Sequence, residues 1–159
     1  DVDRMTLKAA QSDDRQSLAG ESECSGFLPL GSARLQMDLT LTVPEGFNLT
    51  AEATNGDVDI ETSEAESVTA DTTNGDITLL ASPPVEIRTD TTNGDISITL
   101  PATAEPAISF DTTNGDTTIN GFQADSTESG SAVDRMVGNG THRVTAATVN
   151  GDITIRGEG

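Results

Sequence analysis

The sequence predicts an all-β fold, a parallel β-solenoid with rungs of about 19 residues, and three observations lead to this prediction. The seven letters DTTNGDI begin at Asp71 and at Asp90, and they recur from Asp111 with Thr as the last letter. The tripeptide Asn-Gly-Asp occurs five times, at spacings of 19, 19, 21 and 36 residues. Apolar and polar residues alternate on both sides of each tripeptide. Repeats of this period are typical of stacked supersecondary units.

The alternation is clearest when the five copies are aligned on their Asn residues. Of the 25 positions at offsets −6, −4, −2, +3 and +5, 19 are apolar and six are Thr, whereas the interleaved offsets hold two apolar residues, Ala147 and Val149. A period of two is typical of strands with one buried face. Thr and Ile favour extended backbone, and Asn-Gly supplies the positive φ of a tight corner. Each copy is therefore expected to be strand, turn and strand.

Two strand pairings are compatible with these columns. If each Asn-Gly is a type I′ hairpin turn, the chain is an antiparallel β-meander or sandwich, and the matching parity on both sides of the turn favours this alternative. If each copy is one coil of a solenoid, like offsets stack on like at about 4.8 Å. The near identity of the copies favours the solenoid, because stacked rungs give equivalent residues equivalent surroundings. The inward column of Thr72, Thr91 and Thr112 then forms a hydrogen-bonding ladder.

We expect one domain over residues 1–159. Residues 1–34 are predicted to form an irregular N-terminal cap, with short strands near 5–9 and 17–21, and residues 35–119 to form regular rungs. Within them, the alternating residues 35–43 are interpreted as the closing strand of an earlier, degenerate rung. Residues 120–143 are predicted to be an irregular rung or loop and 144–156 the last rung. The chain begins at Asp1 without a leader segment, so we expect a mature or excised piece of a longer protein.

Charge limits the partners. There are 27 acidic and 8 basic residues, a formal charge of −19, so phosphate backbones and anionic lipid surfaces repel the chain. We therefore expect no nucleic acid and no anionic membrane surface as a partner, whereas cationic partners stay possible. The sequence has no long apolar run, so we also expect no direct membrane insertion. The balance is typical of halophilic proteins, and an ordinary acidic extracellular protein is the equal alternative.

Residue types that carry catalysis are scarce, so the sequence predicts that the chain is not an enzyme. His142 is the only histidine and stands in a Gly-rich turn, and Cys24 is the only cysteine, which excludes an intramolecular disulfide and a thiolate metal site. No nucleophile motif is present. Carboxylates are plentiful, but there is no Trp or Tyr for a sugar to stack on.

A cation site is the sharper alternative. In a solenoid, one outer column would consist of aspartates, flanked by a second row of Glu52, Asp71, Asp90 and Asp111; the aspartates of the column are Asp57, Asp76, Asp95, Asp116 and Asp152. Like charges about 5 Å apart repel, and Ca²⁺ would relieve them. The spacing fits neither the EF-hand loop nor the nonapeptide calcium repeat, and each Asp could instead cap its own turn. We therefore expect no cofactor, with Ca²⁺ as the alternative.

The chain also resembles a known family, the adhesin-like domains with β-strand repeats of bacteria and archaea, related to the auto-transporter adhesin head domain. The resemblance covers roughly residues 35–156 and is carried by TTNGDITL at Thr72, TTNGDISITLP at Thr91, LTVPEGFNLTAEATNGDVDI at Leu41 and THRVTAATVNGDITIR at Thr141. It implies a β-helix-like fold on the cell envelope or outside the cell, with no assigned activity.

The leading functional hypothesis is a non-catalytic, adhesin-like structural or binding module of the cell envelope or the secreted space. Its ligand or protein partner is unknown, and recognition is expected through segment 120–143 or through the lateral faces of the stack. The alternatives are a Ca²⁺-binding surface domain that uses the Asp column and a non-catalytic fragment of a larger surface enzyme.

Overall fold

The computed structural model describes residues 4–11, 18–23, 46–62, 65–82, 86–122, 132–136, 140 and 142–159, and strands are the regular structure of these residues. The strands are β1 (Arg4–Gln11), β2 (Leu18–Glu23), β3 (Phe47–Asn55), β4 (Val58–Thr62), β5 (Ser67–Asn74), β6 (Ile77–Ala81), β7 (Glu86–Asn93), β8 (Ile96–Pro101), β9 (Pro106–Asn114), β10 (Thr117–Asn120), β11 (Ala132–Met136), β12 (His142–Asn150) and β13 (Ile153–Glu158). The strands expected near residues 5–9 and 17–21 correspond to β1 and β2. The strand expected over 35–43 lies outside the described residues.

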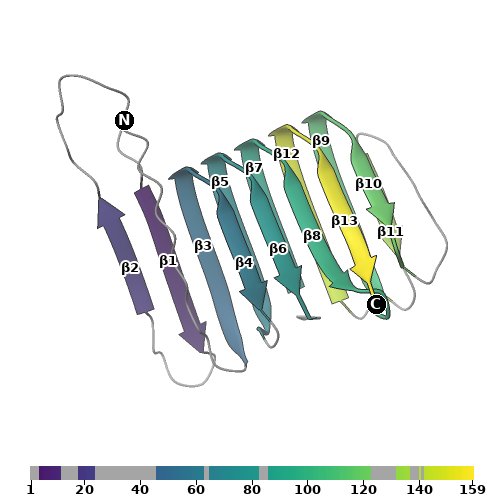
Figure 1. Ribbon diagram of the computed structural model, residues 1–159, viewed down its shortest axis with the longest axis horizontal. Coiled ribbons are helices and arrows are strands. Elements are labelled where there is room, and N and C mark those ends of the chain that lie inside the picture. The colour runs from purple at the N-terminus through teal and green to yellow at the C-terminus, as the bar shows by residue number, and fades with distance from the viewer. Residues whose placement is uncertain are drawn as a thin grey trace.

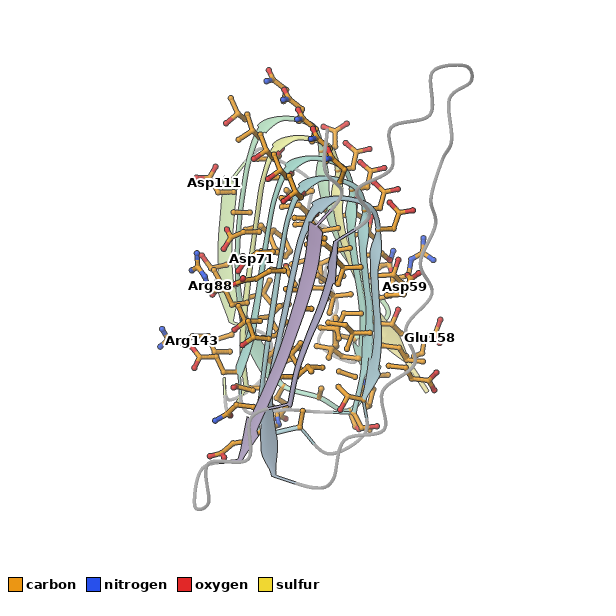
Figure 2. All side chains as sticks on the ribbon, turned by 90° about the vertical axis from the view of Figure 1, so that its left-hand side faces the viewer. Asp59, Asp71, Arg88, Asp111, Arg143 and Glu158 are labelled. Carbon is orange, nitrogen blue, oxygen red and sulfur yellow. The ribbon has the colours of Figure 1, made fainter. Side chains whose placement is uncertain are left out.

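The strands form two facing sheets (Figure 1). The larger sheet has eight strands in the order β11-β9-β12-β7-β5-β3-β1-β2, and the smaller has five in the order β10-β13-β8-β6-β4. Each repeat runs along the larger sheet, turns at its Asn-Gly-Asp and returns along the smaller one, so that the corners arch over one end of both layers (Figure 2). The five rungs are β3–β4, β5–β6, β7–β8, β9–β10 and β12–β13.

The register confirms the solenoid. Neighbouring rungs pair in parallel with like offsets opposite each other, as in Val68 beside Ile87 and Asn74 beside Asn93. The hairpin alternative is wrong, because the two strands that flank each Asn-Gly lie in different sheets. No described residue other than Gly has a positive φ, whereas a type I′ turn needs one at both central positions. Shared parity across the corner therefore reflects two sheets that face one core.

The rungs do not stack in chain order. Strand β12 pairs with both β7 and β9, and β13 pairs with both β8 and β10, all in parallel. The C-terminal rung (residues 142–158) consequently lies between the third rung (86–101) and the fourth rung (106–120). The columns stay intact, because Thr148 stands beside both Thr91 and Thr112.

Antiparallel strands flank the rungs of the larger sheet at both ends. Strand β1 pairs antiparallel with β3 and with β2 at one end, and β11 pairs antiparallel with β9 at the other. Each reverses the strand direction of the stack next to an outermost rung. Such a reversal covers an edge that could otherwise recruit another parallel strand.

The core consists of the inward columns. Of the 25 aligned positions, 24 are buried, and the remaining one, Ala53, is partly buried. The most enclosed side chains are the aliphatic residues at the centre of the stack, such as Ile77, Ile98 and Ile155. Burial of this apolar surface on both sheets is the main source of stability.

Inward threonines close the core beneath the corners. In four rungs the Thr hydroxyl at offset −2 donates to the carbonyl oxygen of a corner glycine in the neighbouring rung, at 3.0–3.2 Å; the donors are Thr72, Thr91, Thr148 and Thr112. Thr89 differs, since its side chain is 0% exposed and its hydroxyl has no hydrogen-bond partner among the described residues. Two buried threonines of β7, Thr89 and Thr91, therefore have opposite energetic roles.

Substitution by Val separates these roles. Thr89→Val removes an unsatisfied buried hydroxyl at nearly constant volume and should stabilise the fold by about 1 kcal/mol. Thr91→Val removes a donor to Gly75 and should destabilise the fold by about 1 kcal/mol. Urea unfolding of both variants measures the difference. Changes of the same sign in the two variants would contradict the assignment.

Candidate functional site

The repeated tripeptide forms a ladder of asparagine side chains along the corner. In four of the five rungs the Asn side-chain amide donates through Nδ2 to the Oδ1 of the Asn in the neighbouring rung, at 2.8–2.9 Å; in spatial order the ladder is Asn55, Asn74, Asn93, Asn150 and Asn114. These side chains are exposed. The Asn column is thus held by identical bonds from rung to rung, which only a translational stack provides.

The five candidate aspartates form the column beside it. Their spatial order is Asp57, Asp76, Asp95, Asp152 and Asp116, and in each of the first four an Oδ1 accepts the backbone N–H of the next Asp, at 2.8–3.0 Å. The carboxylates therefore bond across rungs and not to their own turns. Repulsion within the column is offset by these charge-assisted bonds to backbone N–H groups.

The described residues contain no group of three or more His, Cys, Asp or Glu side chains arranged to hold a metal ion. Cation binding by the Asp column stays a prediction.

Glycine at the corner is required by close approach. A Cβ on Gly75 would lie 2.1 Å from the carbonyl oxygen of Gly56, and a Cβ on Gly94 or Gly151 would meet the next corner carbonyl at 2.0 Å. The same glycines have φ between 154° and 156°, where other residues are strained. Four of the five corner glycines, Gly56, Gly75, Gly94 and Gly151, also donate their N–H to the Asn carbonyl of the adjoining rung; for Gly75 this distance is 3.0 Å.

The outer face of the larger sheet carries a second acidic row, at offset −3. Glu52 lies opposite Asp71, and Asp71 lies opposite Asp90, on directly paired parallel strands. The C-terminal rung then places Ala147 between Asp90 and Asp111. Neighbouring parallel strands are about 4.8 Å apart, so the first three carboxylates form a compact group of like charge.

Asp71 lies beside Arg88 on the outer face of the larger sheet (Figure 2). Partial burial raises the pKa of its carboxyl above the ordinary value of 3.8, and the charges of Asp90 and Glu52 raise it further. The Arg88 guanidinium lowers the pKa of Asp71 but forms its own ion pair with Asp90. Asp71 is thus a half-buried carboxyl on which the charges of Asp90, Arg88 and Glu52 act.

Comparison with protein-family models identifies the family of the chain. Residues 37–156 match the model of the Toastrack DUF4097 family, a family of unknown function with a β-solenoid-like fold. The chain belongs to the Toastrack DUF4097 family. Searches of curated proteins and of solved structures found no match.

Sequence reasoning located the columns of this Toastrack domain but missed two features of the acidic row. The first is Arg88. The alternation could have indicated it, because Arg88 lies two residues before Asp90 and hence on the same face of the sheet. The interruption by Ala147 had no signal in the sequence, because it depends on the order in which the rungs stack.

Other predicted elements of this Toastrack domain are only partly described. His142 is half-buried at the start of β12, opposite Pro106. Within segment 120–143, residues 123–131, 137–139 and 141 lie outside the described residues, so the recognition role expected for the segment stays a prediction. Among the described residues, no helix is long and apolar enough to cross a membrane.

Replacement of Asp71 tests the electrostatics of the acidic row. The pKa of Asp71 is raised in the folded state. At pH values between 3.8 and the pKa of the folded state, the folded protein therefore binds more protons than the unfolded chain. The ionised carboxyl consequently destabilises the fold at neutral pH. Asp71→Asn should therefore raise the free energy of unfolding at pH 7 by at most about 1 kcal/mol, because the group is partly exposed. The gain should vanish below pH 3.8.

The matched control is Asp59→Asn, which removes the same charge from an exposed position of the smaller sheet, opposite Thr78. Urea melts at both pH values measure both variants. A gain in Asp71→Asn that equals the control, or that persists unchanged in acid, would refute the explanation by burial and like charge.

Proposed function

We propose that this Toastrack domain is a non-catalytic, adhesin-like structural and binding module that acts at the cell envelope or outside the cell. One observation carries the proposal: the repeated Thr, Asn, Gly and Asp positions bond to or pack against the adjoining rung. The repetition of the motif is accounted for by these bonds. A structural role therefore explains the motif without any further chemistry.

The outer face of the larger sheet is the surface best suited to recognition. It presents Glu52, Asp71 and Asp90 side by side on three paired strands. The net charge of −19 adds a long-range field that attracts cations. A partner of cationic chemistry, such as a lysine-rich segment of another surface protein, fits this face best.

The two alternatives remain predictions. No contact within the described residues favours cation binding by the Asp column. No such contact favours the hypothesis that the domain is a non-catalytic part of a larger surface enzyme.

A matched pair of double variants tests recognition by this face. Glu52→Gln with Asp71→Asn removes two charges from the larger sheet, and Asp59→Asn with Glu61→Gln removes two charges of the same types from the smaller sheet. Titration of each with an oligolysine peptide should show affinity reduced about tenfold by the first pair, because adjacent carboxylates act on the same ammonium groups. The second pair should show only the smaller effect of net charge.

Equal losses of affinity in the two variants would contradict a defined face, and no binding by the unmodified chain at low salt would contradict a cationic partner.

Location is tested separately, by surface protease treatment of intact source cells. Protection of the domain inside the cells would contradict an envelope or extracellular role.

A further inference from the structure

The corner also exposes a reactive dipeptide in every rung. In Asn-Gly, the backbone nitrogen of Gly can attack the Asn side-chain carbon Cγ, because Gly has no side chain to hinder the approach. A bond forms between this nitrogen and Cγ, the bond from Cγ to Nδ2 breaks, and ammonia leaves with the displaced proton. Water then opens the cyclic imide to Asp or isoaspartate. The net change is the replacement of the side-chain amide by a carboxylate, with water as the only co-reactant.

Four of the five corners hold the attacking nitrogen in a hydrogen bond. The N–H groups of Gly56, Gly75, Gly94 and Gly151 donate to the Asn carbonyl of the adjoining rung, at 2.9–3.0 Å. Attack at these corners requires the bond to open first. The neighbouring Asn amides in the interior of the ladder are also bonded on both sides, so the side chain must leave the ladder as well. Local opening of this kind lowers the rate by the fraction of time spent open.

The corner of the fourth rung is different, because it is the last one on its side of the stack. Gly115 is exposed, and its N–H has no acceptor among the described residues. Asn114 is exposed too and is anchored on one side only, where Nδ2 donates to Asn150 at 2.9 Å and to the Val149 carbonyl at 3.5 Å. Its Oδ1 accepts no bond from a described residue. Within the described part of the chain, the nucleophile thus has no hydrogen bond to break and the electrophile is held by a single neighbouring rung.

We propose that Asn114 is a site of spontaneous deamidation, the most reactive of the five corner asparagines in the folded protein. The product carries a carboxylate in place of the amide that donates to Asn150, and it adds a negative charge at the end of the Asp column, beside Asp116. The fourth rung then loses the bond from Asn114 to Asn150 and gains repulsion between the new carboxylate and Asp116. The fraction of chains modified at this end of the stack would therefore increase with the age of the protein.

The repeat provides its own matched controls. The tetrapeptide Thr-Asn-Gly-Asp is identical around Asn55, Asn74, Asn93 and Asn114, so the intrinsic reactivity is the same at these sites and differences report the structure. The full chain is incubated at mildly alkaline pH, and the fraction converted at each site is measured by peptide mapping with mass spectrometry. Asn139, outside the described residues, is measured as a separate peptide and enters no comparison.

In the folded chain, Asn114 should react faster than Asn74 and Asn93 by a factor on the order of ten, which corresponds to the loss of about one net hydrogen bond on opening. In strong denaturant the four sites should react at equal rates. Asn114→Gln should abolish conversion at that site and leave the rates at Asn55, Asn74 and Asn93 unchanged. A folded-state rate at Asn114 no greater than at Asn74 would overturn the proposal, and so would a preference for Asn114 that persists in denaturant.

Discussion

The close approach of glycine backbones at the corner is the constraint on which the other interactions depend. A Cβ at Gly115 would lie 1.9 Å from the carbonyl oxygen of Gly151, so one corner can stack on the next only where the residue that faces the neighbouring carbonyl lacks a side chain. This contact brings equal offsets of adjoining rungs into register. Asn then meets Asn, each Asp meets the backbone of the next Asp, and each Thr at offset −2 reaches a glycine carbonyl. The ladders are consequences of one translational repeat.

The C-terminal rung joins the two parts of this stack. The third and fourth rungs share no strand pairing among the described residues, and each is paired instead with the rung of β12 and β13. The backbone bonds of the corner follow the same route, from Gly94 to Asn150 and from Gly151 to Asn114. Folding of the central core must therefore wait for the last residues of the chain. The many non-local pairings that result are of the kind that slows folding.

Much of the fold could be predicted because it is written in a period of two and a period near 19. The inward columns, the outward Asp column and the acidic row all follow from these periods. The order of the rungs could not be predicted, since Val144 and Ile108 occupy equivalent columns and any stacking order satisfies the same pattern. For the same reason, the bonding partner of each Asp and the interruption at Ala147 were out of reach. The matching parity on both sides of the corner could not distinguish a hairpin from an arch between two sheets, because both arrangements produce it.

The most direct test of this account is the neighbour of β8 in solution. Cross-strand nuclear Overhauser effects connect backbone protons only on adjacent strands, about 4.8 Å apart. The account predicts contacts between Ile98 on β8 and Ile155 on β13, together with contacts between Ile155 and Ile119 on β10. Direct contacts between Ile98 and Ile119, with Ile155 at the end of the sheet, would place the rungs in chain order and contradict the central position of the C-terminal rung.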